Sequence, residues 1–151
     1  MKCLAVLGLL ALAGCASAMV EHDAQSSCAK QHKTAFLFDA HQSGIPLVFE
    51  SASVMVLCVG PDDVTHLPAV FGADAVSASN FQGAGIVSVA AGAVAARAGL
   101  KPNDIVYEFA GNSIASVADL RIEVDSHAAG EQAVVKVRRG RQRDLVLTAN
   151  F

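Results

Sequence analysis

Short runs of apolar residues recur through the second half of the chain and predict β-strands. Gly85–Val89 and Ile105–Phe109 are rich in β-branched and aromatic residues, which favour buried strands. Ala133–Val137 and Leu145–Thr148 alternate apolar with polar or charged residues, a pattern typical of strands with one exposed face. We therefore predict four strands in this half of the chain, preceded by one more.

The segment between the first two strands predicts a short helix followed by a tight turn. Ala93–Gly99 is rich in alanine, which favours one or two helical turns, and Gly99 can take the left-handed conformation that ends them. Pro102 then fixes its own φ, and Asn103 tolerates a positive φ. These two residues suit the central positions of a type II turn.

A longer helix is predicted from residue 116 onward. Ser116 is a suitable N-cap, and Asp119 follows three residues later, where the positive end of the helix dipole favours an acidic side chain. Val117, Leu120 and Val124 then recur at helical spacing, which predicts one apolar face. Residues 128–130, Ala-Ala-Gly, end the run.

Three segments in this order and spacing resemble a bacterial PDZ domain of the type found in high-temperature-requirement serine proteases: Gly85–Val89, Ala95–Val106 and Gly111–Ile114. The resemblance implies an α+β fold that is mainly β. We expect a PDZ-like, partly open β-barrel or sandwich over residues 68–151, covered by the two predicted helices, with a short β-rich extension at residues 34–67 before it.

The resemblance also implies a site for a peptide. A PDZ domain adds the peptide as a strand to a sheet edge, while backbone N–H groups of a preceding loop hold the terminal carboxylate. The matching loop residues are Phe71, Gly72 and Ala73, and Asp74–Val76 would be the receiving edge. Alternatively, Phe71 is a core residue and Gly72 an ordinary bend, and Asp74 would repel a carboxylate unless its side chain faced away. We expect Gly72→Val to block the loop without entering the core.

The longer helix would form the opposite wall of this groove. We expect it to present Arg121 with one or more of Val117, Val124 and Asp125. Alternatively, Val117 and Val124 belong to the core, and Arg121 is a solvated surface charge.

The first residues have the proportions of a signal peptide. Lys2 precedes an apolar run too short to span a bilayer permanently, and residues 12–15 read Leu-Ala-Gly-Cys. This resembles the lipobox of bacterial lipoproteins, which implies removal of residues 1–14 and lipidation of Cys15. Cleavage after Ala16–Ala18 would instead leave a soluble periplasmic chain. In a Gram-negative source, Ala16 after the cysteine implies an outer-membrane anchor facing the periplasm.

Composition and cysteine content complete the picture of an exported chain. The formal charge of −3 does not favour a nucleic-acid partner, and a chain with no Trp and one Tyr has a core of small side chains. Once Cys3 is removed and Cys15 lipidated, Cys28 and Cys58 remain, and an exported pair is most simply a disulfide.

Residues 15–67 resemble no family that we can name. We expect residues 15–33 to be a tether, with the polar residues from 19 to 32 extended or disordered. In the extension, Thr34–Phe38, Pro46–Phe49 and Ser53–Val59 are strand candidates. We expect them to pair with one another and to pack on the PDZ-like body, with Gly60–Asp63 as the turn that leads out.

Two chemical alternatives to peptide binding are a nucleophilic serine and a metal site. Gly111–Ser113 looks like the surroundings of a nucleophilic serine, but no His and Asp in a convincing context accompany it, so we expect no enzyme activity. A metal site could use His22, Cys28, His32 and His41, but the segment lacks a fourth ligand at a defined spacing, and Cys28 is better used in a disulfide. We expect neither a metal nor another cofactor.

These observations predict a non-catalytic envelope lipoprotein that binds protein C-termini or exposed peptide strands through a PDZ groove. It would act as an adaptor, an assembly factor or a protease regulator. The alternative is a structural lipoprotein with a degenerate PDZ fold, which binds a partner complex through residues 34–59.

Overall fold

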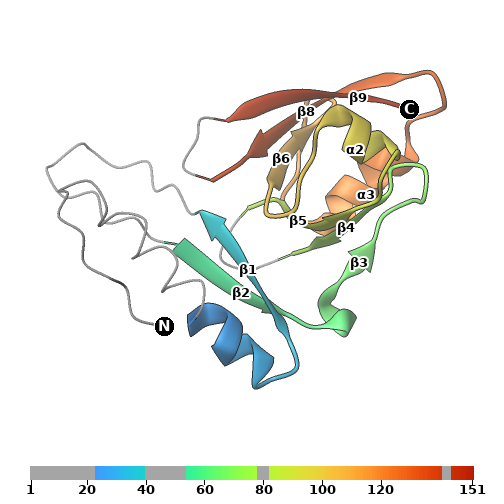
Figure 1. Cartoon of the computed structure of the whole chain (residues 1–151). Coiled ribbons are helices and arrows are strands. Elements are labelled where there is room, and N and C mark those ends of the chain that lie inside the picture. The colour runs from blue at the N-terminus through green and yellow to red at the C-terminus, as the bar shows by residue number, and fades with distance from the viewer. Residues whose placement is uncertain (1–22, 40–53, 78–81, 141–143) are drawn as a thin grey trace, which may run out of the picture.

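The computed structural model describes residues 23–39, 54–77, 82–140 and 144–151, which form a small and a larger antiparallel sheet (Figure 1). The larger sheet has the order β3-β4-β5-β6-β8-β9, and β7 pairs with β6. The predicted mainly β, α+β fold is confirmed, with open sheets and no closed barrel in the described ranges. The strands are β1 (Thr34–Asp39), β2 (Val54–Val59), β3 (Thr65–His66), β4 (Ala73–Val76), β5 (Ala84–Val89), β6 (Ile105–Phe109), β7 (Asn112–Ser113), β8 (Gln132–Arg138) and β9 (Leu145–Asn150).

The helices of the described residues lie at residues 23–29, at α2 (Val94–Ala98) and at α3 (Val117–Asp125), and a 3-10 turn, η1, spans Pro61–Asp63. In this part of the chain, no helix has the length and apolar character that crossing a membrane requires.

Both predicted helices of the larger domain are present. α2 ends where the sequence indicates, whereas α3 ends at Asp125, before the predicted residues 128–130. Gly99 caps α2 in the left-handed conformation, and Asn103 in the following turn has a φ of 72°. Ser116 Oγ accepts the N–H of Asp119, whose carboxylate accepts the N–H of Ser116 in return. This reciprocal capping box starts α3 at the predicted residue.

The main core is built from small aliphatic side chains around a few aromatic rings. Phe71 and Phe109 are fully buried and meet edge to face, with ring centroids 6.0 Å apart. Phe151, near the end of β9, packs against both rings. Val117, Leu120 and Val124 on one face of α3 complete the same cluster, as their helical spacing predicted.

A buried ion pair, which the sequence did not indicate, holds the turn before β6. Asp104 is fully buried, and its carboxylate accepts two hydrogen bonds from Arg139. Nε donates to Oδ1 at 2.6 Å, and a terminal guanidinium nitrogen donates to Oδ2 at 2.7 Å. Arg139 also donates to the carbonyl of Gly99 at 2.7 Å. The hydrogen bond to Asp104 raises the pKa of Arg139 above its ordinary value. The pair therefore ties the end of α2 to β8.

The extension forms a unit of its own that packs on the larger sheet. β1 and β2 pair antiparallel from Thr34 opposite Val59 to Asp39 opposite Val54. Phe36 and Leu57 pack against a second buried cluster that contains Val76 and Ile105 of the larger sheet. The expected strand pairing and packing are thus confirmed for the first and third strand candidates, whereas Pro46–Phe49 lies outside the described residues.

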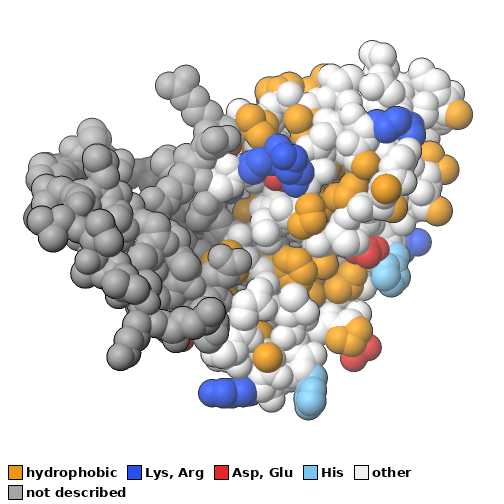
Figure 2. Space-filling view, viewed as in Figure 1, with side chains coloured by type: hydrophobic (Ala, Val, Ile, Leu, Met, Phe, Trp, Pro, Cys, Tyr) orange, Lys and Arg blue, Asp and Glu red, His pale blue; other side chains and the backbone are white. Residues whose placement is uncertain are grey.

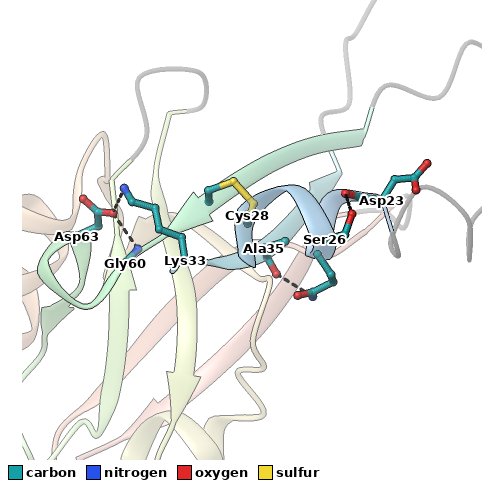
Figure 3. Close-up of a disulfide and its surroundings, with 9 residues drawn as sticks. Asp23, Ser26, Cys28, Lys33, Ala35, Gly60 and Asp63 are labelled. Atoms are coloured by element: carbon teal, nitrogen blue, oxygen red, sulfur yellow. Dashed lines mark hydrogen bonds and ion pairs between the residues drawn. A yellow bond between two sulfur atoms is a disulfide. The ribbon is translucent and has the colours of Figure 1, made fainter. Parts of the chain in front are cut away.

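The predicted disulfide joins Cys28 of the helix at 23–29 to Cys58 of β2 (Figure 3). The expectation of extended or disordered chain is wrong for residues 23–29. Their helix is fixed by tertiary contacts, since Cys28 is fully buried and Gln25 donates to the carbonyl of Ala35. His32 takes a positive φ beyond the helix end, where a glycine would have signalled a stop.

The turn from β2 toward β3 is fixed by one carboxylate. Asp63 accepts the N–H of Gly60 and the ammonium group of Lys33, each at 2.9 Å (Figure 3). These contacts lower the pKa of Asp63, with the Lys33 hydrogen bond as the largest cause. The predicted turn at Gly60–Asp63 is therefore present, as η1.

Reduction of the Cys28–Cys58 disulfide is expected to lower the free energy of unfolding by about 3–4 kcal/mol, because the cross-link no longer restricts the unfolded chain. Urea unfolding with and without a thiol reductant, with free thiols counted in parallel, measures the effect. An unchanged urea midpoint in fully reduced protein would contradict it.

Candidate peptide-binding site

The loop between β3 and β4 turns its carbonyl groups toward residues 90–95, which run from the end of β5 into α2. The carbonyl oxygens of Val70, Phe71 and Gly72 accept the N–H groups of Val94, Ala95 and Ala90 at 3.2, 3.0 and 2.8 Å. In a planar trans peptide the next residue's N–H points opposite to the carbonyl. The N–H groups of the three predicted loop residues, Phe71, Gly72 and Ala73, therefore point away from α2, as a loop that holds a carboxylate requires.

Gly72 has a left-handed backbone in this loop, with a φ of 66°. A Cβ atom there would lie 2.3 Å from the Cβ of Ala93, which precedes α2. A valine at this position would therefore collide with Ala93 and displace the loop from the start of α2, while the expectation that Gly72→Val leaves the core unentered stays a prediction. Phe71 is fully buried, so its ring belongs to the core while its backbone shapes the loop.

The predicted receiving strand, β4, is paired along both edges. β5 lies along one edge, with Ala73 opposite Val89, and β3 lies along the other (Figure 1). In the β3 pairing, Thr65 is opposite Ala75 and His66 is opposite Asp74. The edge away from β5 is the one that could receive a peptide, and the chain's own β3 occupies it.

The residue after β3 continues this pairing into the core. The N–H of Leu67 donates to the carbonyl of Ala73 at 3.0 Å. The Leu67 side chain is only 6% exposed and belongs to the cluster that contains Phe71, Ala73 and Val124. The structure thus brings three of the predicted site residues into one cluster with Leu67, which sequence reasoning did not single out.

The helix residues predicted for the opposite wall have different environments. Val124 is 3% exposed and, like Val117, is part of the core, which was the alternative interpretation of both. Arg121 is exposed and lies 3.7 Å from the carboxylate of Asp125, one turn further along α3. Arg121 therefore contacts solvent and its own helix.

Asp74 turns its carboxylate to the outer face of the sheet. Oδ2 accepts the hydroxyl of Ser88 on β5 at 2.7 Å, and Oδ1 lies 2.6 Å from Nδ1 of His66 on β3. The Ser88 hydrogen bond is the main cause of a lowered pKa at Asp74; partial burial opposes it, and His66 adds to it. The negative charge thus lies on the face opposite Ala73 and Ala75, whose side chains are buried.

A sheet edge that ends at a loop whose N–H groups face that edge is the arrangement by which a peptide-binding module holds a peptide strand and its terminal carboxylate. The chain matches the PDZ domain family over residues 52–148 and belongs to that family. The match starts before residue 68, where the sequence placed the start of the domain, and includes β2. A PDZ domain binds peptides or proteins and is not itself a catalytic domain.

Two solved structures similar to the chain are a complex of the HtrA3 PDZ domain with a phage-derived ligand, FGRWV, and the HtrA-type protease AlgW with a decapeptide. The first is 23% identical over 46% of this chain and 62% of the other, with a TM-score of 0.40. The second is 19% identical over 54% of this chain and 27% of the other, with a TM-score of 0.46. This chain thus spans less than two thirds of either, and no curated protein matches it.

Gly72→Ala and Gly92→Ala form a matched pair of substitutions. Both glycines have a positive φ, but a Cβ at Gly92 meets no atom within 4 Å. Gly92→Ala should cost about 1–2 kcal/mol of unfolding free energy for the left-handed backbone alone. Gly72→Ala should cost roughly 2 kcal/mol more, because it also collides with Ala93. Equal urea midpoints for the two variants would show that the loop tolerates a side chain.

Asp74→Asn should destabilise the protein near neutral pH by about 1 kcal/mol. The pKa of Asp74 is lower in the fold than in the unfolded chain, so its stabilisation is present above about pH 4 and is lost as the pH falls through the lowered pKa. Urea unfolding from neutral pH downward should show the difference from wild type shrinking in acid. A difference that does not change with pH would contradict this assignment.

Proposed function

We propose that this protein is a non-catalytic lipoprotein of the bacterial envelope that binds protein C-termini or exposed peptide strands along the β4 edge. The observation that carries the proposal is the direction of the loop. Its three successive carbonyls are engaged by residues 90–95, so its N–H groups face the end of the edge where a terminal carboxylate would lie.

The face of the protein drawn in Figure 2 fits a protein ligand better than a nucleic acid. On the face drawn in Figure 2, the Lys and Arg side chains of the described residues stand apart from one another, with hydrophobic side chains exposed between them. The formal charge of −3 also gives no electrostatic attraction for phosphate backbones. A peptide strand held by backbone hydrogen bonds and an apolar anchor needs neither basic patch nor cofactor.

The location of the protein is part of the proposal. The Leu-Ala-Gly-Cys sequence would place a lipid on Cys15, in the outer membrane and facing the periplasm, and the residues before the helix at 23–29 would link it to the folded body. The disulfide between Cys28 and Cys58 supports an oxidising compartment. Without a catalytic step, such a protein would act as an adaptor, an assembly factor or a regulator of a separate protease.

A second candidate is favoured by the pairing of β3 with β4. If β3 never leaves, the groove is degenerate, and the β1–β2 unit at residues 34–59 would be the surface that binds a partner complex. Val56 of β2 is 38% exposed and would belong to that surface.

Binding to an array of peptides with free C-termini tests the first candidate. The best ligands should bind with micromolar affinity, roughly −8 kcal/mol. The same peptides with an amidated C-terminus should bind about tenfold more weakly, because the loop N–H groups lose a charged acceptor. Amide chemical shifts should change at Phe71–Ala75. Absence of binding, or shift changes confined to β1 and β2, would instead support the second candidate.

A further inference from the structure

We propose that the segment Val64–Pro68, which we call the internal segment, is a built-in occupant of the β4 edge, and that a ligand binds by displacing it. This inference rests on the proposed function, and it adds both the regulation of the site and the class of peptide that fits it.

The internal segment has the direction and position of a bound C-terminus. A ligand whose carboxylate lies at the loop before β4 must run antiparallel to β4, and β3 does so. Leu67 then stands where the last residue of a ligand would stand, with its N–H on the carbonyl of Ala73. The carbonyl of Pro68, one residue further on, accepts the N–H of Gly72 at 2.9 Å, so the chain itself already supplies an acceptor to this loop.

The side chains of the internal segment indicate the ligand's sequence. Leu67 is only 6% exposed and lies in the cluster that includes Phe71 and Val124, which fits a leucine-sized last residue. On the outer face, His66 is held by Asp74, although the His66 side chain is 80% exposed. A ligand that replaces the segment therefore meets the Asp74 carboxylate with its penultimate side chain. The peptides that fit the site therefore end in leucine and have a basic or hydrogen-bond-donating residue at the penultimate position.

The internal segment is a short occupant that a longer strand can replace. Only Thr65 and His66 form β3, whereas β4 has four residues and pairs with β5 along all of them. In the sequence, η1 at Pro61–Asp63 precedes the internal segment and the loop that contains Gly72 follows it. A displaced segment therefore stays attached to the protein at both ends. The internal segment would compete with every ligand. It would lower the apparent affinity, because only the molecules in which the β4 edge is open can bind.

The probe for the test is a labelled peptide with the chain's own sequence from 61 to 67, Pro-Asp-Asp-Val-Thr-His-Leu, with a free C-terminus. Fluorescence polarisation should show that Leu67→Ala binds the probe about tenfold more tightly than wild type, because the competing anchor is gone. His66→Ala, which changes an exposed side chain, should bind it a few-fold more tightly.

Leu100→Ala is the matched control. Leu100 is only 4% exposed and lies in the same cluster, but it follows α2 and is outside the internal segment. It should lower stability as Leu67→Ala does, yet leave probe affinity unchanged. Asp74→Asn should reduce the preference for the probe over a peptide ending in Ala-Leu, by about fivefold.

The outcomes separate the two proposals. Equal probe affinity in wild type, Leu67→Ala and His66→Ala would overturn the internal occupant while the binding function stands. A similar gain of affinity in Leu100→Ala would overturn it too, because loosening of the core would then be the cause. If no variant binds the probe and no array peptide binds wild type, the proposed function fails as well.

Discussion

The pairing of β3 with β4, continued by the hydrogen bond from the Leu67 N–H to the Ala73 carbonyl, is the contact on which the rest of the arrangement depends. It connects the disulfide-bonded extension to the larger sheet, because η1 leads directly from β2 into β3. It also places Leu67 in the main core. This short strand therefore links the extension to the larger sheet and closes the β4 edge.

The two sides of that loop have separate roles. Its carbonyls are bonded to residues 90–95, and the close approach requires Gly72, since a side chain there would collide with Ala93. The buried pair of Asp104 and Arg139 holds the far end of α2 through the Gly99 carbonyl. The loop thus rests on a helix anchored at both ends, which keeps the N–H groups directed toward the β4 edge without a ligand.

Local signals predicted most of the fold. The capping residues Ser116 and Asp119 and the positive φ of Asn103 act within a few residues, so the sequence was enough to locate α3 and the turn before β6. The site was only partly predictable. Two-residue β3 has no periodicity to detect, and the burial of Leu67 follows from contacts distant in sequence. For the same reason, the collision at Gly72 and the partner of Asp104 could not be predicted.

Amide hydrogen exchange at Leu67 in the ligand-free protein is the most direct test of the internal segment. The N–H of Ile86, which donates to the Asp104 carbonyl at 2.8 Å, provides a reference inside the same sheet. We expect the Leu67 N–H to exchange far more slowly than an amide in an unstructured peptide. It should still exchange faster than the Ile86 N–H, because a replaceable edge strand opens more readily than a central one. Exchange of Leu67 at the open-chain rate, with Ile86 protected, would contradict the occupied edge.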